Sequence, residues 1–173
     1  MTLEQALKGT VAPPEVAATQ ALLNLEYLDF GGQKRIGQLV AHRDLEAEIH
    51  AIFGEILELR FPIFAMMQVV VYDWSDDVSM RENNCSAFNY RLKVGQSVLS
   101  AHSTGRAIDI NPVQNPYIRG DLVLPPGAIY DKSILGTLLE EEGVVAAFES
   151  RGWEWGGRWT RLKDWHHFEK PSV

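Results

Sequence analysis

Residues 100–109 read Ser-Ala-His-Ser-Thr-Gly-Arg-Ala-Ile-Asp, and the rest of the chain is organised around this stretch. It carries His102 and Asp109 seven residues apart, with Gly105 between them. If 106–110 is a strand, Asp109 points to one face of it, because side chains alternate along a strand. Gly105 can take a positive φ, which lets the segment that carries His102 fold back over the strand. The spacing therefore allows an imidazole and a carboxylate to reach the same point.

A second group of polar residues lies at 164–169, which read Asp-Trp-His-His-Phe-Glu. Asp164 and His167 are three residues apart, a spacing that a turn brings side by side. His167 and Glu169 share one face of a short strand, so Glu169 either accepts a hydrogen bond from a ligating imidazole or is a surface carboxylate. His166 is the competing ligand, but in a strand it points opposite to His167, which favours His167.

Two imidazoles and one carboxylate are typical of a zinc centre. His102, Asp109 and His167 supply three ligands and leave the fourth tetrahedral position open for water, as in a catalytic site. Zinc bound in this way keeps a positive charge, so it acidifies water and polarises a carbonyl oxygen. A carboxylate outside the ligand set can then act as general base, and Asp164 is the candidate. We therefore expect one Zn²⁺ per chain and a hydrolytic reaction.

The composition is that of an ordinary globular protein and predicts a single domain over 1–173, with 1–12 loosely ordered. A net charge of -7 and the lack of a lysine and arginine cluster argue against nucleic acid as a partner. No segment approaches the roughly 18 apolar residues of a membrane span. The N-terminus lacks the basic start and apolar run of an export signal. We expect the protein to stay in the cytoplasm until it is released, unless an export segment precedes this sequence.

Sequence periodicity predicts an α+β fold. Apolar residues at helical spacing predict helices over 43–60 and 137–151, the second with Gly152 as its C-terminal cap, and a shorter helical segment over 13–25. Residues with strand propensity predict four strands, at 36–40, 67–72, 86–92 and 106–110. Residues 112–127 contain several prolines and are predicted to form a long loop.

These motifs resemble the zinc D-Ala-D-Ala carboxypeptidase family (VanY-type), which includes phage L-alanyl-D-glutamate endopeptidase endolysins. The family pattern S-x-H-x-x-G-x-A-x-D is met by residues 100–109, and the pattern D-x-x-H-F-E is met by residues 164–169. The resemblance extends from about residue 25 to residue 169. Further matches are Ser86-Ala87-Phe88-Asn89 with Arg91, Asp109-Ile110-Asn111-Pro112, Asn115-Pro116-Tyr117 and residues 152–157.

The resemblance implies a small antiparallel sheet that carries the zinc and is flanked by helices, an architecture shared with the hedgehog signalling domain. It implies that His102, Asp109 and His167 are the ligands and that Asp164 is the general base. It also implies that Arg91 steadies the oxyanion that forms when water attacks the peptide carbonyl.

Several residues are left with open roles. Ser100 and Ser86 are candidates for orienting the ligands or the substrate. Arg158 stands where many relatives have an aspartate, a departure that puts the choice of substrate in doubt. Three tryptophans either line a groove or pack in the core, and we expect at least one in the core: Trp153, Trp155 and Trp159.

The function that the resemblance implies is a zinc metallopeptidase that hydrolyses the stem peptides of bacterial peptidoglycan. The sequence does not determine the oligomeric state, and a monomer is the favoured expectation. Two bonds compete, namely the terminal D-Ala-D-Ala bond of a carboxypeptidase and the internal L-Ala-D-Glu bond of an endolysin. The alternative is a zinc-containing binding module of hedgehog-like architecture without peptidase activity. Asp164 discriminates between them, because a pure binding module needs no base. A structural zinc would require four protein ligands.

Overall fold

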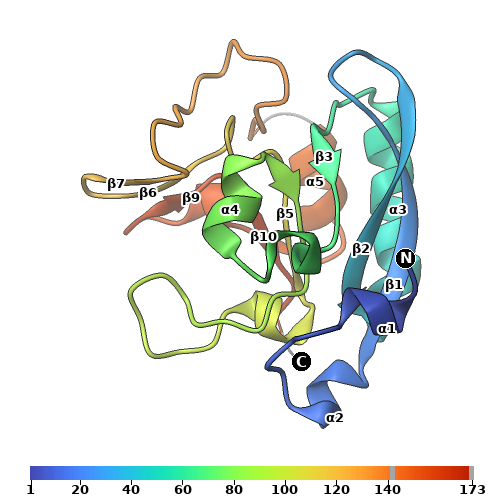
Figure 1. The fold of residues 1–173 in the computed structure, drawn as a ribbon. Coiled ribbons are helices and arrows are strands. Elements are labelled where there is room, and N and C mark those ends of the chain that lie inside the picture. The colour runs from blue at the N-terminus through green and yellow to red at the C-terminus, as the bar shows by residue number, and fades with distance from the viewer. Residues whose placement is uncertain (141–142, 172–173) are drawn as a thin grey trace.

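The protein has an α+β architecture, seen in a computed structural model that describes residues 1–140 and 143–171. In Figure 1 the N-terminal strands and the long helix α3 (Glu46–Glu58) lie on one side of the molecule. The short strands β5 (Ala107–Asp109) and β10 (His167–Glu169) lie at its centre. The predicted fold class is confirmed. Among the described residues, no helix has the length and apolar character needed to cross a bilayer.

The N-terminal hairpin consists of β1 (Gln20–Leu28) and β2 (Lys34–His42), which pair in antiparallel register. The strand predicted at 36–40 lies within β2. The helix predicted over 13–25 is wrong, because only α2 (Pro14–Ala17) is helical there. Buried and exposed side chains alternate through the second half of β1, the period of a strand. Adjacent leucines also fit a helical turn, so the apolar pattern alone did not distinguish a helix from a strand in this segment.

The N-terminus is attached to this hairpin. Within residues 1–12, which were expected to be loosely ordered, Leu3–Ala6 forms helix α1, whose first turn is closed by a capping box. Ala6 is buried and packs with Val40 of β2 and with Phe88. These contacts give this segment a defined position against the rest of the fold.

Helix α3 confirms the helix predicted over 43–60, and a 3-10 turn, η1 (Arg43–Leu45), leads into it. Its apolar stripe packs against β1 and against helix α5 (Gly143–Glu149). The buried members of this stripe are Ile49, Ile52, Phe53 and Ile56. The hydrophobic core of the protein therefore forms between the N-terminal hairpin, α3 and α5.

Helix α5 is shorter than the helix predicted over 137–151. Within the described residues it begins at Gly143, and residues 141–142 lie outside them. Leu138 precedes the helix and is fully buried. This leucine packs in the core from a non-helical segment, which is why the apolar pattern predicted too long a helix. Gly152 follows the helix with a φ of 76°, the left-handed conformation expected of a C-terminal cap.

The segment predicted as a strand at 67–72 is instead a 3-10 helix, η2 (Val69–Tyr72). Its valines have high strand propensity, but strand propensity depends on tertiary context. The chain turns sharply after η2, because Asp73 and Trp74 both have positive φ. Helix α4 (Asp76–Arg81) follows directly, and within the described part of the chain these valines pair with no strand.

The strand predicted at 86–92 is also wrong. A short parallel pair, β3 (Ala65–Met66) and β4 (Asn84–Cys85), ends just before it. Ser86 makes an isolated bridge to Asp109, in which each residue's backbone N–H donates to the other's carbonyl. The extended chain that follows Ser86 therefore passes beside the end of β5 without forming a continuous strand ladder with it.

The predicted loop over 112–127 contains a hairpin. Strand β6 (Tyr117–Arg119) pairs with β7 (Leu122–Leu124) on one side and with β9 (Lys163–Asp164) on the other. Gly120 sits in the turn with a φ of 57° and supplies the left-handed conformation that the reversal requires. The prolines that suggested a loop lie outside the paired residues, so they do not interrupt the strand ladder.

Strand β10 is the middle strand of the central sheet, between β5 and β8 (Glu154–Trp155). Ile108 and Phe168 are fully buried on the face that packs against the hydrophobic core. Their sequence neighbours Asp109 and His167 point to the opposite face, because strand side chains alternate. Packing of one face of these strands against the hydrophobic core therefore fixes the position of the polar side chains on the opposite face.

Candidate metal centre and its pocket

The register of the central sheet brings the two distant motifs together. His167 on β10 pairs directly with Asp109 on β5. His102 reaches both from the 3-10 turn η3 (Ala101–Thr104), which Gly105 ends with a φ of 69°. A Cβ at Gly105 would lie 2.6 Å from a backbone nitrogen of β2, so glycine is required for the turn to pack this closely. The turn predicted from the sequence is confirmed at this position.

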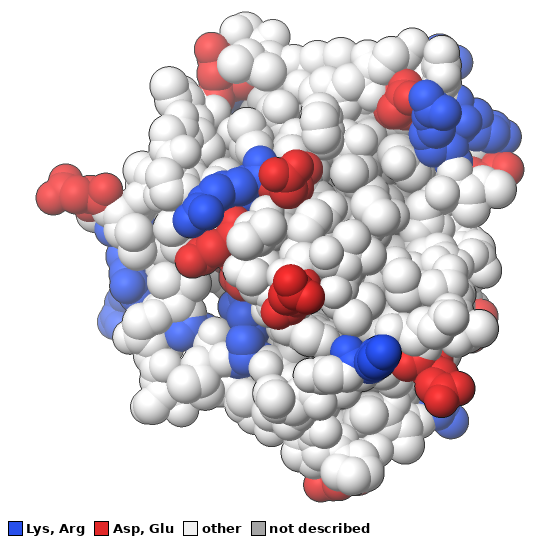
Figure 2. Space-filling model, in the orientation of Figure 1, with Lys and Arg blue, Asp and Glu red and all other residues white. Residues whose placement is uncertain are grey.

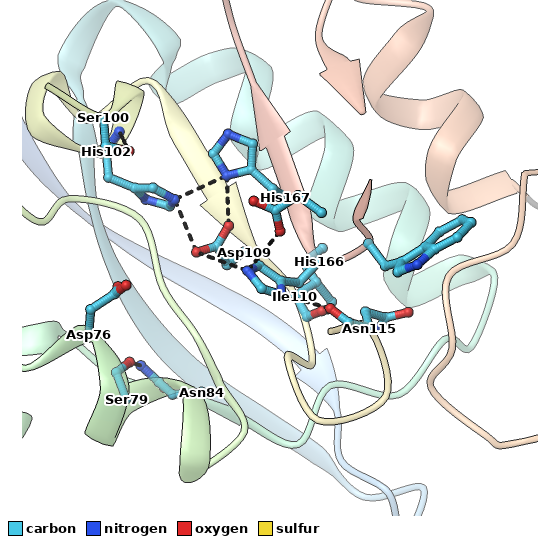
Figure 3. Close-up of polar contacts among 12 residues, drawn as sticks. Asp76, Ser79, Asn84, Ser100, His102, Asp109, Ile110, Asn115, His166 and His167 are labelled. Atoms are coloured by element: carbon cyan, nitrogen blue, oxygen red, sulfur yellow. Dashed lines mark hydrogen bonds and ion pairs between the residues drawn. The ribbon is translucent and has the colours of Figure 1, made fainter. Parts of the chain in front are cut away.

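Three ligand-type atoms converge on one point, as Figure 3 shows. Nε2 of His102 lies 3.0 Å from Oδ2 of Asp109, and Nδ1 of His167 lies 2.9 Å from Oδ1 of the same carboxylate. The two imidazole nitrogens are 3.2 Å apart. A tetrahedral ion with bonds of about 2.0–2.1 Å holds neighbouring ligand atoms about 3.3 Å apart. The side chains therefore fit a zinc-sized ion with little rearrangement.

The other nitrogen of each imidazole has its own partner. Nδ1 of His102 makes a short hydrogen bond to the carbonyl of Ala87. Nε2 of His167 lies 3.0 Å from Oε2 of Glu169. A carbonyl and a carboxylate only accept, so each contact places the proton on that nitrogen and leaves the lone pair of the inner nitrogen free. Both histidines are thus held in the tautomer that metal binding requires.

The electrostatics of this group are those of a charge-compensated cluster. Burial opposes ionisation of Asp109, but the charges of His102 and His166 and the imidazole hydrogen bonds hold the pKa of this carboxyl well below its usual range. Burial also opposes protonation of His167, but hydrogen bonds to Asp109 and Glu169 raise its pKa to about 10. Without a metal the His167 imidazole therefore holds a proton next to the carboxylate, and a divalent cation would displace it.

The group opens into a cavity of about 340 Å³. Asp164 and Arg91 line it together with the three ligand-type residues. Its apolar wall is formed by Tyr117, Leu124, Trp159 and Leu162. On the molecular face drawn in Figure 2, lysine and arginine side chains lie next to aspartate and glutamate side chains. The cavity thus offers a substrate both charged groups and an apolar surface beside the ligand cluster.

Asp164 is placed at the cavity by the pairing of β9 with β6, in which it lies opposite Tyr117. A Cβ on Gly156 would lie 2.5 Å from the carbonyl oxygen of Asp164, so glycine allows this close approach. Oδ1 of Asp164 lies 3.0 Å from Nε2 of His166, as an ion pair without the alignment of a hydrogen bond. Asp164 therefore stands beside the ligand cluster but outside it.

Arg91 also lines the cavity, and it is held at both its backbone and its side chain. Its Nε lies 2.9 Å from Oδ1 of Asp76, a residue of α4 for which the sequence contained no signal. Its backbone N–H donates to Oγ of Ser103, and that hydroxyl donates to the carbonyl of Arg91. Ser103 thus ties Arg91 to the turn that carries His102.

The two serines that the motifs singled out act on the backbone of this region. Oγ of Ser100 accepts a long, 3.4 Å hydrogen bond from the backbone N–H of His102 at the start of η3. Ser86 pairs with Asp109 through backbone hydrogen bonds at 3.1 and 2.8 Å. Ser100 therefore contacts the turn that carries His102 and also lines the cavity, whereas Ser86 meets Asp109 through its backbone.

The tryptophans divide between core and cavity. Trp153 and Trp155 are buried in the core, which confirms the expectation for at least one of them. Trp159 lines the cavity with its ring 5.5 Å from the ring of His167. Arg158, the residue that departs from the family pattern, forms ion pairs with Glu140 and Glu149. Its guanidinium is therefore engaged in a surface network.

The geometry defines a class of protein. Three ligand-type side chains around one point, a further carboxylate beside them and an open cavity form the candidate metal centre of a hydrolase. Residues 94–170 match the family described as D-alanyl-D-alanine carboxypeptidase. This segment contains all three ligand candidates, and its match to the peptidase family supports the resemblance seen in the motifs. No significant match is found among curated proteins or among solved structures.

Proposed function

We propose that the protein is a zinc metallopeptidase that hydrolyses stem peptides of bacterial peptidoglycan. The observation that carries the proposal is the convergence of His102, Asp109 and His167 beside a cavity, inside a segment that matches a peptidase family. We also propose that 1–173 acts as a single domain and as a monomer. The single-domain proposal is supported by a core cluster that includes residues from Leu23 to Phe168.

In this proposal His102, Asp109 and His167 hold one Zn²⁺. When bound, zinc supplies the positive charge that acidifies water and polarises the carbonyl of the scissile bond. The carboxylate of Asp164 takes the proton of the attacking water and passes it to the nitrogen of the leaving amine. Glu169 holds His167 in the ligating tautomer through the contact to Nε2.

Arg91 is proposed to face the negative charge that develops on the carbonyl oxygen. A fixed cation aimed at this charge lowers the barrier more effectively than a mobile one, because it needs no reorganisation during the reaction. The contacts to Asp76 and Ser103 support such a fixed position. Ser100 and Ser86 are proposed to orient the residues that carry the ligand atoms.

The experiment that identifies the bond is digestion of purified peptidoglycan, followed by mass spectrometry of the products. Release of D-alanine would identify a carboxypeptidase, and a new D-glutamate N-terminus would identify an L-Ala-D-Glu endopeptidase. A chelator should abolish the activity, and added zinc should restore it. Intact wall after incubation with the zinc-loaded protein would overturn the proposal and favour a zinc-containing binding module.

The role of Asp164 is tested by Asp164→Asn, with Asp121→Asn as the matched control. Asp121 is an exposed residue in the hairpin turn between β6 and β7. Loss of a general base lowers turnover by about 10²- to 10⁴-fold, while zinc content should stay at one ion per chain. Retained zinc with unchanged turnover would rule out Asp164 as the base.

A further inference from the structure

His166 is a buried titratable residue that the proposed mechanism does not use. Only 3% of its surface is exposed, and its two ring nitrogens point to different partners. Nδ1 lies 2.6 Å from the carbonyl oxygen of Asn115, and Nε2 lies 3.0 Å from Oδ1 of Asp164. The imidazole therefore spans the space between a backbone carbonyl and the candidate base.

The Asn115 end of this connection is fixed. Asn115 is fully buried, and its side-chain amide donates to the carbonyls of Ile110 and Gly136 at 3.2 and 3.0 Å. Its side-chain oxygen accepts from the backbone N–H of Leu138 at 2.7 Å. A carbonyl held in this way gives the His166 ring a defined direction, because Nδ1–H must donate to it.

The Asp164 end leaves one carboxylate oxygen available. His166 engages Oδ1, and within the described part of the chain Oδ2 has no hydrogen bond or ion pair. Nε2 of His166 is 3.9 Å from Oδ2 of Asp109, whereas the corresponding distance for His102 is 3.0 Å. His166 is therefore closer to the candidate base than to the carboxylate of the ligand cluster.

We propose that His166 is a positioning residue that holds the carboxylate of Asp164 at the cavity, with its other nitrogen anchored on the carbonyl of Asn115. The proposal rests on the function proposed above. It assigns to the sequence pair His166-His167 two separate tasks, in which His167 contacts the ligand cluster and His166 orients the base. Alternation along the chain gives the two rings different directions, and the structure places a different partner at each.

A double-mutant cycle tests this proposal, because residues that act as a unit lose activity non-additively. His166→Ala should lower kcat by about 10- to 100-fold with little change in KM, the range typical of residues that orient a catalytic group. The double variant with Asp164→Ala should be no less active than Asp164→Ala alone. His166→Gln, which keeps an N–H donor, should recover part of the loss, and the exposed His50→Ala on α3 should match the wild type.

Three different results would overturn the positioning role of His166. Multiplicative losses in the double variant would mean that His166 acts independently of Asp164. Loss of zinc from His166→Ala as complete as from His167→Ala would make His166 a ligand, and unchanged kcat would remove any positioning role.

A second cycle, read out by melting temperature in the presence of a chelator, needs no peptidase activity. Non-additive shifts for His166→Ala and Asp164→Ala are expected there, and additive shifts would count against the contact. If the wild type proved inactive on peptidoglycan, the proposed function would fail, while this second cycle would still decide whether the two side chains are coupled.

Discussion

Removing the charge of Glu169 should weaken zinc binding without touching a ligand. Its Oε2 lies 3.0 Å from Nε2 of His167, and its side chain is 20% exposed, so solvent screens the contact only in part. The hydrogen bond from His167 lowers the pKa of Glu169, so the contact favours the ionised carboxylate. Glu169→Gln keeps an acceptor oxygen of similar size but removes this charge.

The size of the effect follows from the type of hydrogen bond that is lost. A hydrogen bond to a charged group contributes about 1.5–3 kcal/mol, and a neutral one contributes about 0.5–1.5 kcal/mol. The difference of about 1–2 kcal/mol corresponds to about a 5- to 30-fold weaker affinity for zinc, since 1.4 kcal/mol is tenfold. Glu169→Ala removes the acceptor entirely and should approach about 100-fold.

The assay is competition for zinc against a chromophoric chelator at fixed pH. The matched control is Glu154→Gln, because Glu154 is exposed and lies opposite Glu169 in the register of β8 and β10. The control should bind zinc as the wild type does. Equal zinc affinity of Glu169→Gln, Glu154→Gln and wild type would refute the reasoning that this carboxylate supports the ligating tautomer of His167.

Three further predictions concern stability in urea. Gly105→Ala should cost more than about 1 kcal/mol, because its φ is positive and its Cβ would meet backbone atoms, whereas Gly54→Ala in the open middle of α3 should gain about 0.5–1 kcal/mol. Phe168→Ala should cost about 3–5 kcal/mol, because its fully buried ring stacks within the core. Neighbouring carboxylates outweigh burial and raise the pKa of His166 to about 9 and of His167 to about 10. In zinc-free protein, the contribution of these two residues to stability should therefore be complete below about pH 6.5 and be lost as the pH rises through 9–10.

Each of these predictions has a clear contrary result. A stabilised Gly105→Ala variant would mean that the turn before β5 tolerates a side chain. A loss below about 1 kcal/mol for Phe168→Ala would mean that the core collapses into the space of the missing ring. Zinc-free protein that becomes more stable between pH 6.5 and 10 would contradict the protonated imidazoles beside Asp109.

The sequence alone was sufficient to nominate the polar side chains that the structure brings together and to predict the strongest local structure. The spacings within 100–109 and 164–169 identified His102, Asp109 and His167, because a turn and a strand place residues at such short separations in predictable directions. The helical period of 43–60 and the left-handed glycines at 105 and 152 were predicted from the same kind of local rule.

Tertiary structure decided whatever depends on pairing between distant segments. Leu22 to Leu28 form a strand because β2 is available to pair with them, and 112–127 contains a hairpin because β9 covers β6. The contacts of Arg91 with Asp76 and of His166 with Asn115 likewise join elements that no local period connects. Asp109 and His167 are 58 residues apart, so their meeting is set by hydrogen-bond register across the sheet, and register is a property of the folded chain.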